Sequence, residues 1–476
     1  GKEEDAFYAY GICADLISDC SSAGLIRVAS LEDIEKVENW DKLKADELAS
    51  TLLVRYIAQG TLWKMDDMFQ LSIELYDTKD EKIVWSDRWQ EDWDNLPSIK
   101  GSLSDGLLKT LDIKSKIKWH VETNNTEAYE FYLKGMYRWE NRQNMEDNKI
   151  AQGLFHKAID IDDNLILAKV QLGWTYHELG DYIKAKEMYE SALEQANEIN
   201  DEYIVGFSLH KLGIFYFDKG NNNKALNCLE RSLNIRKIID DKAGMVLSFN
   251  LFGHVYTAMG HYDKALNYYK HSSQIYKELG NIEDLQAANR GFIYYRNGDF
   301  KASFECFTTY RKIQEKLGDK RDIAGSIIAI GKIFQGKGEY DKALENYSLS
   351  LSLYEDIDFK IGIGDSLFSI GEIYLIKRDF QRAEQFLEKS YKIQKEIEWH
   401  GIMCTTIHLF LTYKNRGKKY NVEEVSILIN NSKDFMVYDF NYRVYQLLED
   451  TTYLETAYNQ IQELADNLEP DVAAKF

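Results

Sequence analysis

The sequence has 476 residues, and its 78 acidic and 58 basic side chains give a formal net charge of −20. Hydrophobic residues make up 45% and aromatic residues 13% of the chain, which excludes a disordered or collagen-like protein. The acidic balance argues against nucleic acid or an anionic membrane as the main partner, because clustered lysine and arginine bind both. Only two prolines occur, so helices are expected to dominate.

Cysteine usage and hydropathy indicate the compartment. The five cysteines are scattered and include no Cys-x-x-Cys pair, which is typical of a reducing environment. No apolar run approaches the roughly 20 residues that cross a bilayer, and the first residues do not resemble a signal peptide. We therefore expect a cytoplasmic protein with no membrane segment in this sequence.

Residues 1–119 are predicted to form a small α+β domain. Apolar residues at helical spacing indicate three helices, over residues 6–20, 44–53 and 99–111. A short apolar run predicts a buried strand over 25–29. Three segments alternate apolar and polar side chains, as the strands of an antiparallel meander do: 55–64, 68–77 and 82–89.

A cluster of tryptophans lies near the end of this domain. Trp85, Trp89 and Trp93 could form an aromatic platform for a ligand. However, the even spacing of Trp85 and Trp89 places both on one face of a strand. We expect these two rings to pack against the helices of the domain.

From residue 126 to 415 a motif recurs with a period of about 40 residues. Each copy of the motif begins with a hydrophobic residue and a glycine, and an aromatic residue lies three positions after that glycine. A turn containing a second glycine and then Lys-Ala follow. A small residue lies twelve positions after the anchor glycine, and a bulky one lies sixteen positions after it. The anchors are Gly173, Gly213, Gly253, Gly291, Gly331 and Gly371. These spacings predict helical hairpins, which must stack to bury their apolar faces.

The edges of the repeat array are less regular. The unit over 127–163 keeps only its second helix well, and the unit near 408–417 is degenerate. Helices are expected over 422–430 and 442–468, as in a terminal cap. In the turns over 178–182, 258–262 and 336–340, a glycine occupies the position at a helix C-terminus that requires positive φ. We assign 120–415 to the solenoid and 416–476 to a helical cap.

The repeat resembles the tetratricopeptide repeat family, in its long variety of about 40 residues. The resemblance implies a mainly α fold, a right-handed superhelix of about seven to eight hairpins. It also implies that the first helix of each hairpin lines the concave groove, and the groove positions in this sequence are strongly aromatic. The predicted partner-binding residues are Trp174, His177, Phe207, His210, Phe217, Asn250, His254, Phe292, Tyr295, Lys332, Gln335, Phe368 and Glu372.

The first domain resembles the TolB amino-terminal-like domain that precedes such repeats in bacterial regulators associated with adenylate or guanylate cyclases. The matching segments are 10–19, 54–60, 70–77 and 84–89, and 127–135 resembles the beginning of the repeats. The family has a further strand before its first helix, so we expect this domain to be truncated at its N-terminus. The resemblance implies an upstream effector domain, such as a cyclase, that this sequence does not contain.

No motif for catalysis, cofactor binding or metal binding stands out. The sequence contains no phosphate-binding loop, no dinucleotide fingerprint, no nucleophile elbow and no His-Glu-x-x-His. The glycines at 362 and 364 open a repeat helix, and the acidic cluster over 160–164 lacks the remaining residues of a calcium loop. We therefore expect a protein that is not an enzyme and has no cofactor.

The predicted function is that of a regulatory or scaffold module in signal transduction. The groove would bind a peptide or protein partner and pass its occupancy to the upstream effector, because exposed apolar surface of this kind usually marks an interaction site. An alternative is a peptide-pheromone receptor or a phosphatase-like regulator, which usually has an all-helical front end. A third hypothesis, an enzyme, has no candidate residue.

Overall fold

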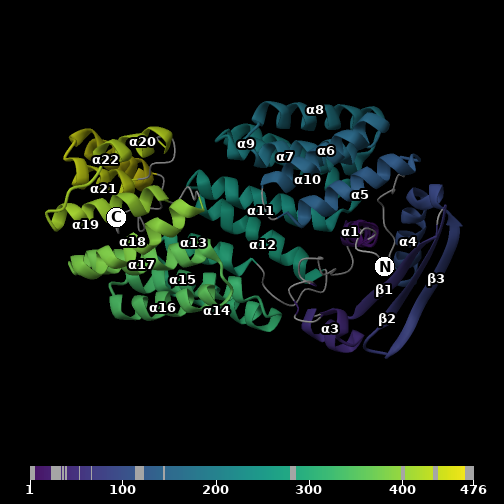
Figure 1. The fold of residues 1–476 in the computed structure, drawn as a ribbon, viewed down its shortest axis with the longest axis horizontal. Helices are drawn as coiled ribbons and strands as arrows, with labels where there is room; N and C mark the ends of the chain where they lie inside the picture. Colours follow the sequence, from purple (N-terminus) through teal and green to yellow (C-terminus); the bar gives the residue numbers. More distant parts are fainter. Residues whose placement is uncertain are drawn as a thin grey trace. The chain divides into compact units, whose positions relative to one another are not determined.

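The computed structural model describes most of the chain. The described residues are 6–22, 34, 37, 40–52, 54–65, 67–112, 123–142, 145–278, 286–397, 402–432 and 438–466. Their contacts divide the chain into two compact units (Figure 1). Unit 1 contains residues 1–259 and 263–283, and unit 2 contains residues 260–262 and 284–476. The domain boundaries expected from the sequence stay a prediction.

The first part of unit 1 is the expected α+β domain. Its elements are α1 (Ala6–Ser22), η2 (Trp40–Lys42), α3 (Ala45–Leu52), β1 (Tyr56–Met65), β2 (Met68–Asp77), β3 (Lys82–Asp92), η3 (Trp93–Asn95) and α4 (Leu96–Thr110). The three strands form an antiparallel sheet in the order β1-β2-β3, with Tyr56 opposite Asp77 and Leu71 opposite Trp89. The predicted meander and the three predicted helices are confirmed. The strand predicted over 25–29 lies outside the described residues.

One face of the sheet carries the core of this domain. Along β2 every second residue is buried, including Phe69, Leu71 and Ile73, and these side chains pack in one cluster with residues of α1 and α4. Trp85 lies against α4, where a Cβ added to Gly106 would meet the indole at 2.6 Å. The indole therefore covers a helix of the domain, as the spacing predicts.

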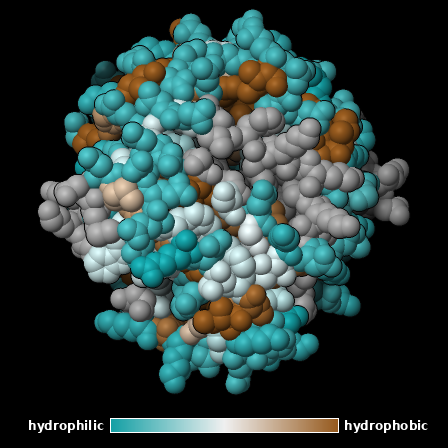
Figure 2. All heavy atoms as spheres, turned by 90° about the vertical axis from the view of Figure 1, so that its right-hand side faces the viewer, coloured by the Kyte–Doolittle hydropathy of each residue, from teal (hydrophilic) through white to brown (hydrophobic). Residues whose placement is uncertain are grey.

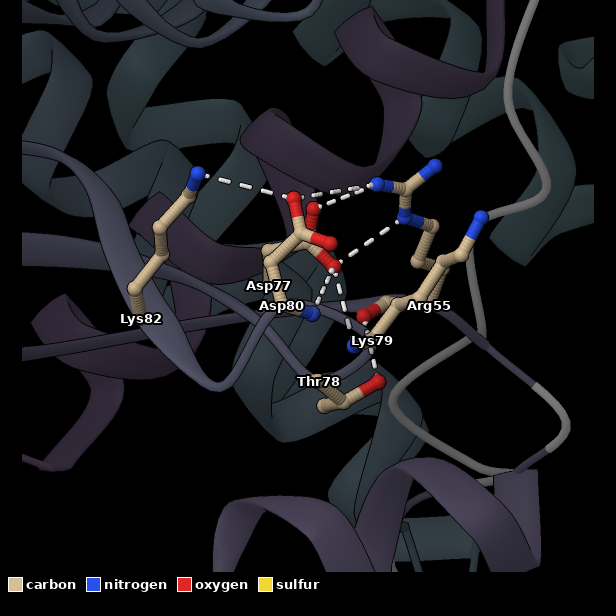
Figure 3. A network of polar contacts seen from close by, with 6 residues as sticks. All are labelled: Arg55, Asp77, Thr78, Lys79, Asp80 and Lys82. Atoms are coloured by element: carbon tan, nitrogen blue, oxygen red, sulfur yellow. Dashed lines mark hydrogen bonds and ion pairs between the residues drawn. The ribbon is translucent and has the colours of Figure 1, made fainter.

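A buried carboxylate closes the hairpin between β2 and β3. Asp77 has an almost fully buried side chain and accepts hydrogen bonds from Arg55 Nε at 3.0 Å and from Arg55 Nη2 at 2.6 Å (Figure 3). Its Oδ1 also accepts the backbone N–H of Lys79 at 3.0 Å. The hydrogen bonds from Arg55 lower the pKa of Asp77 to about 2, against the opposing effect of desolvation.

This arrangement predicts an acid-dependent loss of stability. Because the pKa of Asp77 is lower in the folded state than its ordinary 3.8, its contribution is complete above about pH 4 and is lost as the pH falls through 2. Asp77→Asn is therefore expected to lower the melting temperature by roughly 2–4 °C at pH 6. At pH 2.5 the difference from wild type should be much smaller. The exposed Asp87→Asn on β3 is the control, and a difference that does not change with pH would contradict the assignment.

The rest of unit 1 consists of helical hairpins. Their helices are α5 (Thr126–Glu140), α6 (Met145–Ile161), α7 (Ile166–Glu178), α8 (Tyr182–Glu198), α9 (Glu202–Asp218), α10 (Asn222–Ile239), α11 (Lys242–Ala258) and α12 (Tyr262–Glu278). Each odd-numbered helix is the first helix of its hairpin. Helices α7, α9 and α11 pack on the second helix of the preceding hairpin, and α5, α7 and α9 pack on their own second helices. Helix α11 meets α12 where Gly253 approaches Tyr269.

Unit 2 continues the same pattern and ends in shorter helices. They are α13 (Ala287–Arg296), α14 (Phe300–Leu317), α15 (Lys320–Gly336), α16 (Tyr340–Asp356), α17 (Lys360–Ile376), α18 (Phe380–Glu396), α19 (Ile402–Asn415), α20 (Val422–Ser432), α21 (Tyr438–Leu448) and α22 (Thr451–Asp466). The helices predicted over 422–430 and 442–468 are present, and the second of these regions contains two helices. The chain breaks into α21 and α22 because Glu449 adopts a left-handed conformation with φ of 61°.

The anchor glycines explain why the two helices of a hairpin lie close together. A Cβ added to Gly253 would meet the ring of Tyr269 at 2.5 Å, and one added to Gly331 would meet Tyr347 at 2.6 Å. The same relation joins every predicted anchor to the bulky residue sixteen positions later. The other pairs are Gly173 with Tyr189, Gly213 with Leu229, Gly291 with Phe307 and Gly371 with Leu387. The repeat pattern read from the sequence is therefore the packing pattern of the hairpins.

The first hairpin is more regular than its sequence indicates. Its first helix, α5, is complete, and a Cβ on Gly135 would meet the Phe155 ring at 2.7 Å. Here the partner lies twenty positions after the glycine, and most of this difference arises because Phe155 lies further into α6 than the corresponding residues lie in the other second helices. The first helix is thus formed although its sequence keeps the repeat pattern less well than that of the second helix.

The α+β domain and the first hairpins share one hydrophobic core. The largest cluster of buried residues includes Phe69 of β2, Leu103 of α4 and Leu133 of α5. A polar contact adds to this connection: Glu130 of α5 accepts a hydrogen bond from the Trp93 indole and lies 3.8 Å from Lys64 Nζ of β1. The packing inside unit 1 therefore runs without a break from the sheet into the repeats.

The surface of the described residues is mostly polar. In the view of Figure 2, hydrophilic side chains cover most of the described surface, and the apolar ones form separate patches. No helix among the described residues is both long and apolar enough to span a bilayer.

Candidate functional site

The first helices of the hairpins form the face on which the partner-binding residues were predicted. In unit 1 this first-helix face is made by α5, α7, α9 and α11, and in unit 2 by α13, α15, α17 and α19. The thirteen predicted residues divide between the two units. Trp174, His177, Phe207, His210, Phe217, Asn250 and His254 belong to unit 1, and the other six belong to unit 2.

Two of the predicted histidines in unit 1 are buried. His177 is 7% exposed and lies edge-to-face against Trp174 at 5.5 Å and Phe215 at 5.6 Å between ring centroids. Its Nε2 lies 3.2 Å from Asp218 Oδ2. His210 is 6% exposed. By contrast, His254 is exposed and receives a contact from the Tyr269 hydroxyl at 3.1 Å.

Lys211, which the sequence reasoning missed, lies between two of the predicted aromatic residues. Its Nζ lies 3.9 Å from the centroid of the Trp174 ring and 5.5 Å from that of Phe207, within the range of cation–π attraction. Desolvation lowers the pKa of Lys211 to about 8, and the carboxylates of Glu140 and Glu178 only partly oppose this effect. Its position in the otherwise apolar run 204–217 is the sequence signal that could have revealed it.

A buried ion pair lies beneath this part of the face. Arg236 of α10 and Asp241 are each 2% exposed, with Arg236 Nε 3.6 Å from Asp241 Oδ2. Arg236 also donates hydrogen bonds to the carbonyl of Gly244 and to Ser248 Oγ, and Asp241 accepts the Gly244 N–H at 2.8 Å as the N-cap of α11. Burial and the nearby cations hold the pKa of His210 well below 6.5, so this imidazole is neutral at pH 7.

Several polar side-chain atoms of the first helices are buried without a partner among the described residues, including His177 Nδ1 on α7 and Ser208 Oγ on α9. Two others are Nδ1 of His210 on α9 and Oδ1 of Asn250 on α11, and neither makes a hydrogen bond with any described residue. Such an atom costs about 1–3 kcal/mol when it is left unsatisfied, so it needs an explanation. Leu247, one turn before Asn250, is 48% exposed. The face therefore combines unmet hydrogen-bonding capacity with apolar side chains and one cation.

Helix α1 packs on the same face. It contacts α5 and α11, the first helices of hairpins that are not neighbours, as well as α4 of the α+β domain (Figure 1). The contact with α5 is close, since a Cβ on Gly11 would meet Leu133 Cδ2 at 2.5 Å, and the rings of Tyr10 and Tyr137 lie 5.3 Å apart. Part of the predicted groove is thus covered by the chain's own first helix, which the sequence did not indicate.

In unit 2 the predicted residues centre on a carboxylate. Glu372 of α17 accepts a hydrogen bond from Gln335 Nε2 of α15 at 2.9 Å, and its Oε1 lies 3.5 Å from His408 Nε2 of α19. The Tyr347 hydroxyl donates to Gln335 Oε1 at 2.7 Å, and Phe368 lies edge-to-face on His408. Desolvation raises the pKa of Glu372, but these contacts outweigh it and lower the pKa to about 2.

The remaining predicted residues of unit 2 lie around this network. Phe292 is 51% exposed and Lys332 is exposed, whereas Tyr295 is half-buried. Desolvation and the charge of Glu372 raise the pKa of Tyr295. The hydrogen bonds of Gln335 and Glu372 join side chains of successive hairpins, so this cluster connects repeats. In the parts of the chain that the structure describes, no group of histidine, cysteine and acidic residues could hold a metal ion.

Comparisons with known proteins identify the repeats. A tetratricopeptide repeat model matches residues 205–278 and 322–396, and a second one matches residues 167–198. No curated protein matches the sequence.

Solved structures of similar fold have low sequence identity. BtubC (BKLC) from P. vanneervenii is 17% identical, with a TM-score of 0.40 over 45% of this chain and 90% of its own. The apo form of RapI is 14% identical, with a TM-score of 0.46 over 57% and 99%. Aspartyl phosphate phosphatase F from Bacillus subtilis is 14% identical, with a TM-score of 0.44 over 63% and 82%. At these sequence identities and TM-scores, the solved structures do not indicate what this chain binds. Tetratricopeptide repeat models thus match helical hairpins in both units, and a small α+β domain precedes these hairpins.

Proposed function

We propose that the chain is a non-enzymatic, cytoplasmic regulatory or scaffold module that binds a peptide or protein segment on the first-helix face of unit 1. The observation that carries this proposal is the pair of buried, unpartnered atoms, His210 Nδ1 and Asn250 Oδ1, on neighbouring helices of that face. Buried polar atoms in natural proteins usually have a hydrogen-bond partner, so these two positions are candidates for contacts with a bound segment. An extended segment has backbone N–H and C=O groups that can supply the missing hydrogen bonds.

The side chains around these atoms favour a partner with apolar and acidic groups. Trp174 and Phe207 are partly buried aromatic side chains, the type that contributes most of the binding energy at interfaces. Lys211, held between their rings, has no ion-pair partner among the described residues. A carboxylate of the partner would stabilise the protonated ammonium and raise its pKa above the value of about 8 in the free protein.

Helix α1 provides a physical connection from this face to the α+β domain. A partner that binds at α11 meets α1, because α1 contacts α11, α5 and α4. The shared core and the contacts of Glu130 with Trp93 and Lys64 make the connection stiff. We propose that occupancy of the face is passed in this way to an upstream effector domain, such as a cyclase, in keeping with the TolB-like resemblance of residues 6–112. The three-stranded sheet disfavours a pheromone receptor or phosphatase-like regulator with an all-helical front end.

Variants of the first-helix face test the proposal. A peptide is first selected from a random display library on the full chain, and its affinity is then measured by titration calorimetry. We expect Phe207→Ala and Asn250→Ala each to weaken binding by at least about tenfold, since a buried anchor contributes about 2 kcal/mol. The control is Ile183→Ala on the second helix α8, where the side chain is 75% exposed. Peptides that bind both face variants as tightly as the wild type, while the variants stay folded, would refute the proposal.

A further inference from the structure

A cavity of about 610 Å³ in unit 1 lies between the second helices α10 and α12 and the first helix α11. It is lined by residues of α10, α11 and α12 (Figure 1). One wall consists of aromatic rings. Tyr268 stacks on Phe252 at 4.7 Å and on Tyr256 at 5.4 Å between centroids, and His271 stacks on Phe249 at 5.4 Å. A volume of this size is typical of a small-molecule site.

The charged residues of the cavity have one sign. Lys237 of α10 and Lys264 of α12 line it, and no carboxylate does. Both lysines are exposed, and neither has an ion-pair partner among the described residues. In a chain of net charge −20, a cavity with two unpaired cations is attractive to an anion.

The repeat architecture does not require this combination. Forty positions earlier, the equivalents of Phe249, Tyr268, His271 and Lys237 are Leu209, Cys228, Arg231 and Asn197. The pairing of Lys264 with Tyr256, at 5.3 Å, recurs in Lys224 and Tyr216, at 5.2 Å. The stack of Tyr268 on Tyr256 has a counterpart in Phe386 and Tyr374. The aromatic side chains of Phe249 and His271 recur in none of the other five anchored hairpins, so these two side chains are specific to this place.

We propose that the cavity binds a small planar aromatic anion. The ring of the ligand would stack on the wall formed by Tyr256, Tyr268 and His271, and its carboxylate or phosphate would pair with Lys237 and Lys264. Aromatic faces also attract cations, but two lysines repel a second positive charge. The site combines the second helices α10 and α12 with Phe249 and Tyr256 of the first helix α11, and none of its lining residues is among the predicted partner-binding residues.

Calorimetric titration of the full chain with matched probes tests this inference. We expect 1-naphthyl phosphate to bind at least about tenfold more tightly than 1-naphthol, cyclohexyl phosphate or phenyltrimethylammonium, because only the first has both a ring and a negative charge. The proposal fails if cyclohexyl phosphate binds as well as naphthyl phosphate, or if binding is seen only at concentrations of several millimolar. It also fails if a short phosphotyrosine peptide binds more than tenfold better, because the ligand would then be a peptide.

Substitutions in the cavity test whether the ligand binds there. Lys237→Gln/Lys264→Gln is expected to weaken binding of naphthyl phosphate by about tenfold or more, and Tyr268→Leu should do the same through loss of stacking. The matched control is Lys224→Gln, which removes a lysine from above Tyr216 but leaves the cavity unchanged. All these lysines are exposed, so the variants should fold. Equal affinity in the double variant and the control would overturn the assignment.

Discussion

Asp241→Ala is expected to lower the free energy of unfolding of unit 1 by about 3–5 kcal/mol, the usual cost of removing one partner of a buried ion pair. Arg236 and Asp241 are each 2% exposed, so the change would leave the guanidinium buried and without its counter-charge. It would also remove the carboxylate that caps α11 at the Gly244 N–H, which costs about 1 kcal/mol by itself. Urea unfolding followed by circular dichroism measures the loss.

Two further variants separate these contributions. Asn221→Ala removes an exposed cap of α10, where Asn221 Oδ1 accepts the Lys224 N–H at 3.2 Å, and should cost about 1 kcal/mol. Arg236→Met/Asp241→Leu removes both buried charges and should cost less than Asp241→Ala alone. If Asp241→Ala costs no more than Asn221→Ala, the pair does not stabilise the fold. The stability of this ion pair also bears on the proposed function. Arg236 and Asp241 hold the first turns of α11, and α11 carries Asn250 of the proposed binding face.

The second large effect is expected in unit 2, at Glu372. Its pKa of about 2 lies well below the ordinary 4.5, so the ionised form stabilises the fold by about 3 kcal/mol at neutral pH. Because the folded-state pKa is depressed, this contribution is complete above about pH 4.5 and is lost as the pH falls towards 2. Glu372→Ala should therefore destabilise unit 2 by about this amount at pH 7 and by much less at pH 2.5.

The measurement compares urea unfolding of wild type and variant across this pH range. Other carboxylates titrate equally in both proteins, so the difference between their free energies of unfolding reports on Glu372 alone. Glu345→Ala, on the exposed side of α16, should change stability by no more than about 0.5 kcal/mol at any of these pH values. A difference for Glu372→Ala that stays constant down to pH 2.5 would show that packing, not charge, causes the effect.

The sequence predicts the hairpins because their packing depends on residues at fixed spacing. Each anchor glycine leaves room for one bulky side chain sixteen positions later, as between Gly253 and Tyr269 or between Gly371 and Leu387. The turn glycines Gly180, Gly260 and Gly338 have φ near +76 to +79°, as their place after the first helix predicts. In the same way, the strict alternation along β2 is sufficient to predict the sheet.

The candidate site is less predictable because it depends on contacts between segments far apart in the chain. No local pattern shows that α1 packs on α5 and α11, or that His177 lies inside a group of aromatic rings. The lowered pKa of Lys211 follows from desolvation by the surrounding protein. The sequence gives the residues of the first-helix face, but only the fold separates buried side chains such as His210 from exposed ones such as His254.

Hydrogen exchange of the full chain, with and without the selected peptide, tests the central claim most directly. If the first-helix face of unit 1 is the binding site, the peptide should slow exchange in α9 and α11. Exchange in α1 should also change, because α1 lies against α11. The second helices α8 and α10 should exchange as in the free protein. Protection confined to α8 and α10, or to unit 2, with α9 and α11 unaffected, would contradict the account.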